Sequence, residues 1–151
     1  MQEISIEVQR LPHAVAIPAY QSENAAGVDL YAAHQSLMAI QPMERFLVPT
    51  GIAVAIPEGY QGEIRPRSGL AFASGLTVLN TPGTIDSDYR GEIKVLLINL
   101  GSSSVVIRHG DRIAQMVFMP VVHASFVEVE ALSETARGEG GFGSTDNQPS
   151  L

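Results

Sequence analysis

The chain has 151 residues, of which 45% are hydrophobic, so it is long enough for one domain with a sizeable apolar core. Nine basic residues against sixteen acidic ones give a net charge of -7, which argues against binding to long nucleic acids, and the lack of cysteine excludes disulfides and sulfur-ligated zinc. The sequence shows no signal peptide and no apolar stretch long enough to cross a bilayer, so we expect a cytoplasmic protein without a membrane partner.

Short β-type runs fill most of the chain. In the first, Ile4, Ile6 and Val8 alternate with polar residues, as in a half-buried strand. Turn signals separate the later runs, and only Ser68–Ala73 predicts a helical turn. The later runs are Val28–Tyr31, Phe46–Val48, Ile52–Ile56, Gly62–Ile64, Leu76–Leu79, Ile93–Leu100, Val105–Ile107 and Ile113–Val122. This pattern predicts an all-β fold, a sandwich or jelly-roll-like barrel of short strands.

Two of these runs, Val95–Ile98 and Ile113–Met119, are apolar on both faces. A strand of this kind needs apolar cover on both sides. An inter-sheet core or a second subunit would each supply it, and the sequence leaves both alternatives open for either run.

The C-terminal end differs in composition from the rest. No linker interrupts the chain before about Ser133, so we expect residues 1–133 to form one β domain and residues 134–151 a flexible arm. The segment Arg137–Asp146 contains four glycines and no hydrophobic periodicity. Glycine amides approach a phosphate closely, Arg137 offers a planar fork, and Phe142 offers a face for stacking on a base. A plain linker is the alternative interpretation.

A long polar hairpin, Asn80–Ile93, lies between two apolar runs. Within ten of its residues it contains two carboxylates, Asp86 and Asp88, together with an amide and a phenol. Open backbone groups in such a hairpin can pair with the edge of a flat base, and a carboxylate there can deprotonate a water molecule. A solvated turn is the alternative.

Three further segments contain candidate site residues. In Arg65–Ala71, Ser68 is a candidate N-cap of a short helix whose first amides would face an anion, beside the fork of Arg67. Asp29 is a single acid in an apolar run, which favours a turn acid, an ion-pair partner or a group that orients metal-bound water. Gln115 is polar within an apolar strand and needs a partner, either a substrate oxygen or a backbone group.

Together these segments resemble the five motifs of the homotrimeric dUTP diphosphatase (dUTPase) family, in the family's order. The resemblance implies a jelly-roll-like β fold, a homotrimer with shared active sites, and a C-terminal arm that closes over a neighbour's site. It also implies hydrolysis of dUTP to dUMP and diphosphate with Mg²⁺, which keeps uracil out of DNA and supplies dUMP for dTMP synthesis. The matching segments are Ala26–Ala33, Arg65–Ala71, Asn80–Ile93, Gly110–Phe118 and Arg137–Asp146.

The same resemblance implies roles for single residues. Asp86 matches the acid that activates the water attacking the α-phosphorus. Tyr89 matches the ring that packs on deoxyribose and leaves no room for a 2′-hydroxyl, and Asp29 matches an acid near the water shell of Mg²⁺. The implied substrate contacts are Asn80, Gly83, Thr84 and Ile85 for uracil, Arg67, Ser68, Gly69 and Gln115 for phosphate, and Arg137, Phe142, Gly143, Ser144 and Thr145 in the arm.

Two other functions compete with this one. The dCTP deaminase family shares the fold, but it has a catalytic Glu where this chain has Leu96 and a second Arg where this chain has Phe72. A non-catalytic nucleotide sensor or protein-binding trimer is the other alternative, and the intact Asp86 argues against it. Asp88 receives no role, and we expect Arg112 to orient an acid or an interface.

Overall fold

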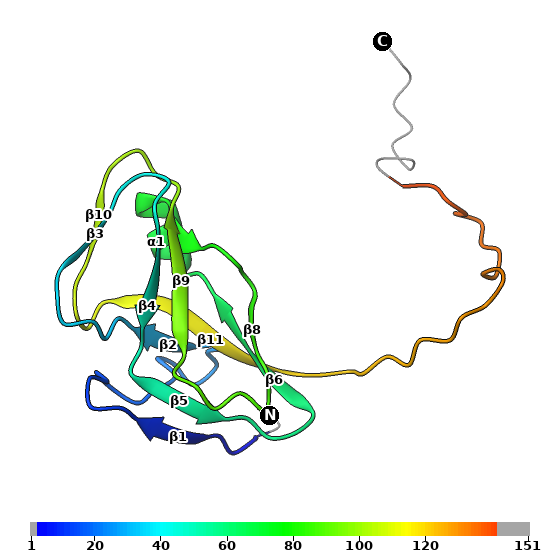
Figure 1. The fold of residues 1–151 in the computed structure, drawn as a ribbon, viewed down its shortest axis with the longest axis horizontal. Helices are drawn as coiled ribbons and strands as arrows, with labels where there is room; N and C mark the ends of the chain where they lie inside the picture. Colours follow the sequence, from blue (N-terminus) through cyan, green and yellow to red (C-terminus); the bar gives the residue numbers. More distant parts are fainter. Residues whose placement is uncertain (1–2, 142–151) are drawn as a thin grey trace, which may run out of the picture.

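The computed structural model describes residues 3–141, and those up to Pro120 form a body of short strands with one short helix (Figure 1). The all-β prediction is therefore confirmed. None of the helices in this described range is long and apolar enough to cross a membrane. The elements are β1 (Glu7–Arg10), β2 (Val28–Tyr31), β3 (Met38–Ile40), β4 (Arg45–Pro49), β5 (Ile52–Ala55), β6 (Tyr60–Arg65), α1 (Ser68–Ser74), β7 (Leu76–Val78), β8 (Gly83–Ile85), β9 (Lys94–Asn99), β10 (Val105–Ile107) and β11 (Arg112–Pro120).

The strands form four small antiparallel sheets that wrap around one core. The largest sheet has the order β2-β11-β6-β8, and a second has the order β4-β9-β7. The pairs β1-β5 and β10-β3 complete the body. Val, Ile and Leu side chains from all four sheets make the core, which includes Leu30, Val48, Ile64, Leu97 and Met116.

The two runs that are apolar on both faces behave differently. In β11, Ile113, Ala114, Met116 and Val117 are all buried within the chain itself, so the inter-sheet core accounts for most of this run. In β9, Leu96 lies beside Leu47 of β4, whose side chain is 55% exposed. The β4-β9-β7 sheet therefore presents apolar side chains on its outer face.

Several elements depart from the sequence expectation. Ile4, Ile6 and Val8 are half-buried and alternate with exposed residues, as expected. Strand β1, however, begins only at Glu7, where its pairing with β5 begins. Strands β3 and β8 were not expected, because each has three residues and depends on a partner distant in sequence.

Beyond Pro120 the chain leaves the body. From Val121 to Gly141 it forms no strand or helix and runs away from the sheets (Figure 1). Phe126, Val127 and Leu132 are exposed along this stretch. The compact body thus ends ahead of the expected boundary at 133, and the division into a domain and a flexible arm stays a prediction.

Candidate active site

The polar hairpin is partly confirmed. Its two arms, β7 and β9, pair antiparallel, with Leu76 opposite Asn99. Between them, however, β8 crosses to the other large sheet and pairs with β6, with Gly83 opposite Ile64 and Ile85 opposite Gly62. The crossing fixes Asp86 directly after a strand, at the edge of a four-stranded sheet.

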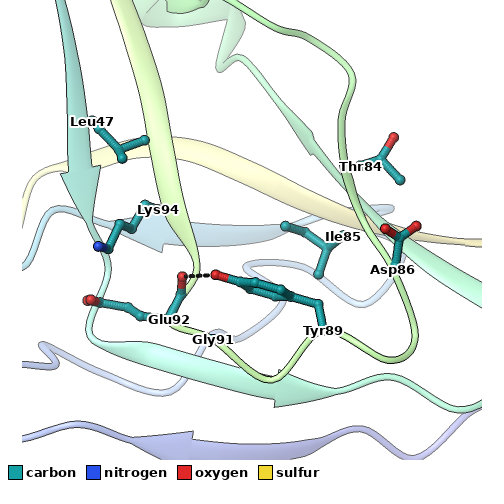
Figure 2. A pocket seen from close by; sticks show the side chains of 8 residues that line it. All are labelled: Leu47, Thr84, Ile85, Asp86, Tyr89, Gly91, Glu92 and Lys94. Carbon is teal, nitrogen blue, oxygen red and sulfur yellow. Dashed lines mark hydrogen bonds between the residues drawn. The ribbon is translucent and has the colours of Figure 1, made fainter.

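A pocket of about 610 Å³ opens at this point (Figure 2). Four of the predicted site residues line it, and they are Thr84, Ile85, Asp86 and Tyr89. Figure 2 shows Asp86 and Thr84 on the β8 side and Glu92 and Lys94 across from them. Sequence reasoning missed the other lining residues, namely Leu47, Gly91, Glu92 and Lys94.

The ring of Tyr89 is held within the hairpin. Its hydroxyl donates a hydrogen bond of 3.0 Å to the backbone oxygen of Glu92. A Cβ atom added at Gly91 would lie 2.4 Å from the Tyr89 hydroxyl oxygen, so a side chain at position 91 would displace the ring. The glycine therefore provides the space in which the Tyr89 ring lies.

Glu92 anchors the end of this hairpin. Its Oε1 accepts hydrogen bonds from the Gly51 amide at 2.9 Å and from His13 Nε2 at 2.6 Å. Partial burial alone would raise the pKa of Glu92, but the hydrogen bonds from His13 and Gly51 and the charges of His13 and Lys94 outweigh it, and the pKa lies below its ordinary value. Glu92 is thus held as a carboxylate at neutral pH.

The predicted phosphate-binding segment forms a second cluster. Arg67 Nε lies 3.1 Å from Asp29 Oδ1, and Arg112 Nη1 lies 3.2 Å from Asp29 Oδ2. The ion-pair alternative for Asp29 is confirmed, and Arg112 does contact an acid. Asp29 is buried, so this pair of arginines neutralises a carboxylate beneath the segment.

Gln115 also supports this segment. Its Nε2 donates to the backbone oxygen of Pro66 at 2.9 Å, which is the backbone alternative that its sequence position allowed. A Cβ at Gly27 would lie 2.7 Å from Gln115 Oε1, so Gly27 leaves the space that this side chain occupies. Within a single subunit, Gln115 therefore holds the backbone at Pro66, directly before Arg67.

The prediction that Ser68 caps the helix is wrong. Arg67 occupies the N-cap position of α1 in an extended conformation and makes no side-chain capping bond. The reason is that the Arg67 backbone oxygen accepts the first helical hydrogen bond, from Ala71, while its guanidinium binds Asp29. Ser68 is the first residue of the helix, and Gly69 follows it with open space where a side chain would be.

The two clusters lie at opposite ends of β6. Ile85 faces Gly62 near the start of this strand, whereas Gln115 faces Arg65 at its end. Asp86 follows Ile85 and so lies still further from Arg65. Arg67 lies two residues past Arg65, in the opposite direction. At about 3.3 Å per residue, Asp86 and Arg67 of one chain are roughly 15–20 Å apart.

The remaining predicted contacts are placed as follows. Asn80 lies beside the hairpin glycine, since a Cβ at Gly83 would be 3.2 Å from Asn80 Nδ2. Arg137 donates from Nε to the Gly140 backbone oxygen at 2.8 Å, within the arm. Phe142, Gly143, Ser144 and Thr145 lie outside the described residues.

A family model described as dUTPase matches residues 13–146, which is most of the chain. The chain belongs to the dUTPase family. Its deoxyuridine 5′-triphosphate nucleotidohydrolase relative from Syntrophotalea carbinolica is 54% identical, over 96% of this chain and 99% of that protein. The relative of the same name from Rhizobium etli is 60% identical over 85% and 84%.

Solved dUTPase structures share the fold. A variant dUTPase of Staphylococcus bacteriophage 80alpha, solved with dUpNHpp, matches 93% of this chain and 98% of its own with a TM-score of 0.84 and 28% identity. The jelly-roll type of β fold expected from the sequence is therefore confirmed, and the chain is an enzyme of the dUTPase family.

Proposed function

We propose that the protein hydrolyses dUTP to dUMP and diphosphate, with Asp86 activating the attacking water. The observation that carries the proposal is the joint placement of Asp86 and Tyr89 in one pocket, in a chain of the dUTPase family. We further propose that it acts in the cytoplasm, where removal of dUTP keeps uracil out of DNA and supplies dUMP for dTMP synthesis.

In this mechanism the Asp86 carboxylate accepts a proton from a water molecule aimed at the α-phosphorus. The water oxygen forms a bond to that phosphorus, the bond to the bridging oxygen breaks, and diphosphate leaves. Orientation and charge stabilisation lower the barrier more than the proton transfer does. Asn80 and the backbone at Gly83–Ile85 would hold uracil, and Tyr89 would pack on deoxyribose.

The phosphate chain would lie on the segment around Arg67, with Ser68, Gly69 and Gln115. Arg67 Nε forms an ion pair with Asp29, and Arg67 Nη1 donates a hydrogen bond of 3.2 Å to the Arg112 backbone oxygen. These two contacts fix the direction of the guanidinium. A preset guanidinium loses less freedom when it binds phosphate. Arg137, Phe142, Gly143, Ser144 and Thr145 would close over the nucleotide from the arm.

We propose Mg²⁺ as the cofactor, held mainly by the triphosphate. Within residues 3–141, no three His, Asp or Glu side chains gather as a metal site. This fits Mg²⁺ well, because the ion keeps several waters and commonly binds through substrate phosphates. Bound there, it would neutralise phosphate charge. A contact of Asp29 with its water shell stays a prediction, since both Asp29 oxygens bind arginines.

A product assay tests the proposed reaction. Incubated with dUTP and Mg²⁺, the enzyme should release equal amounts of dUMP and diphosphate, and incubated with dCTP it should release no ammonia. Ammonia from dCTP would identify a deaminase, and tight nucleotide binding without any product would identify a sensor.

We also propose a homotrimer whose active sites are shared between subunits. Asp86 and Arg67 of one chain lie too far apart along β6 to serve opposite sides of one α-phosphorus, so Asp86 would meet Arg67 of another subunit. The apolar outer face of the β4-β9-β7 sheet, with Leu47 at 55% exposure, and Leu79 directly after β7, at 44%, supply a surface for that contact.

Mixing two inactive variants tests the shared site. Asp86→Asn and Arg67→Ala subunits should each be nearly inactive alone. After equal mixing and co-refolding, about a quarter of the sites combine two intact parts, so about a quarter of wild-type activity should return. No recovery despite mixed trimers on native mass spectrometry would mean that each site belongs to one chain.

A further inference from the structure

We infer that Glu92 and His13 form a clamp that positions Tyr89 and so sets the discrimination of dUTP against UTP. This inference rests on the proposed function. It concerns two side chains 79 positions apart in sequence that meet beside the pocket.

The clamp is a side-chain anchor that ties the hairpin segment 86–92 to other parts of the chain. Other side-chain hydrogen bonds of this segment return to it, as from Arg90 Nη1 to the Ser87 oxygen at 2.6 Å and from Tyr89 to the Glu92 oxygen. The Glu92 carboxylate instead bonds outside the hairpin, to Gly51 and His13. The hairpin therefore transmits any shift of Glu92 to Tyr89.

The partners of Glu92 are themselves fixed. Gly51 has a φ of +72° and sits against Ala14, since a Cβ at position 51 would lie 2.4 Å from Ala14 Cα. The Gly51 backbone oxygen accepts a hydrogen bond of 2.8 Å from Leu11, which holds the segment carrying His13. The clamp thus joins the N-terminal segment, the turn between β4 and β5, and the hairpin.

The backbone oxygen of Glu92 links this clamp to Tyr89. The carboxylate fixes the residue from its side chain, while the backbone oxygen of the same residue accepts the Tyr89 hydroxyl. On its other side the ring meets Gly91. The Ile93 amide, in the same peptide unit as this oxygen, also donates a hydrogen bond of 2.8 Å to the Ile52 oxygen of β5. If the carboxylate is removed, the oxygen that orients the ring keeps only that attachment outside the hairpin, and the ring gains freedom to admit a 2′-hydroxyl.

The test compares kcat/KM for dUTP with kcat/KM for UTP on the same enzyme preparation, so that the active fraction cancels. Glu92→Ala should lower the ratio about tenfold, as expected for loss of a hydrogen-bonded carboxylate. His13→Ala should lower it less, because the Gly51 amide bond remains. Glu92→Gln should keep the ratio near wild type, since its amide oxygen accepts both hydrogen bonds.

A matched control is Glu44→Ala, which removes a carboxylate that accepts the Gln41 amide at 2.8 Å in another turn. It should leave the ratio unchanged. If the clamp only stabilises the fold, activity on both nucleotides falls together, and an unchanged ratio in Glu92→Ala and His13→Ala overturns the inference alone. A wild-type protein inactive on dUTP would overturn the proposed function, and the inference with it.

Discussion

Replacing Asp86 with Asn should reduce kcat by about 10²–10⁴-fold, because the amide keeps the size of the side chain but cannot accept the proton from water. Nucleotide binding should change little, since the proposed contacts to uracil, sugar and phosphate come from other groups. Asp86 is exposed at the end of β8, so the substitution should leave the thermal unfolding temperature nearly unchanged.

Asp88 offers a matched control for this substitution. It is an exposed acid two positions further along the same turn, and it does not line the pocket. Asp88→Asn should keep close to full turnover. Near wild-type turnover in a folded Asp86→Asn protein would remove the residue from the mechanism.

Deleting residues 137–151 should lower kcat/KM by at least about a hundredfold, since the proposed phosphate donors and the stacking ring are lost together. The fold should remain, because the described part of this segment bonds mainly to itself, as in the contact from Gly140 to the Arg137 oxygen at 3.1 Å. Thermal unfolding and dUTP turnover of the shortened protein measure the two effects separately.

Two companion variants sharpen the result. Deletion of residues 147–151 alone removes chain beyond the arm motif and should be nearly silent. Phe142→Ala should cost roughly 1–3 kcal/mol of transition-state binding, the scale of base–aromatic stacking. Full activity after deletion of residues 137–151 would show that the segment is only a linker.

Local patterns in the sequence predicted much of the fold. Runs such as Val28–Tyr31 and Ile52–Ile56 carry enough β-branched and apolar residues to form strands wherever they pair. By contrast, β8 has only Gly83, Thr84 and Ile85 and exists because β6 offers an edge. Strand pairing between distant segments leaves no local signal, so the crossing of the hairpin was missed.

The same limit applies to the site. The motif around Asp86 could be found from residue types, but the clamp could not, because Glu92 is a single acid after a glycine and His13 a single histidine near prolines. Ser68 shows the opposite error. Its residue type favours an N-cap, yet the N-cap position is occupied one residue earlier by Arg67, which forms an ion pair with Asp29.

The most direct test of the proposed reaction is the fate of the attacking water. Hydrolysis of dUTP in water enriched with oxygen-18, followed by mass spectrometry of both products, reports which phosphorus is attacked. Attack on the α-phosphorus, next to the deoxyribose that Tyr89 would contact, predicts the label in dUMP and none in diphosphate. Label in diphosphate would place the attack on the β-phosphorus and contradict the role assigned to Asp86.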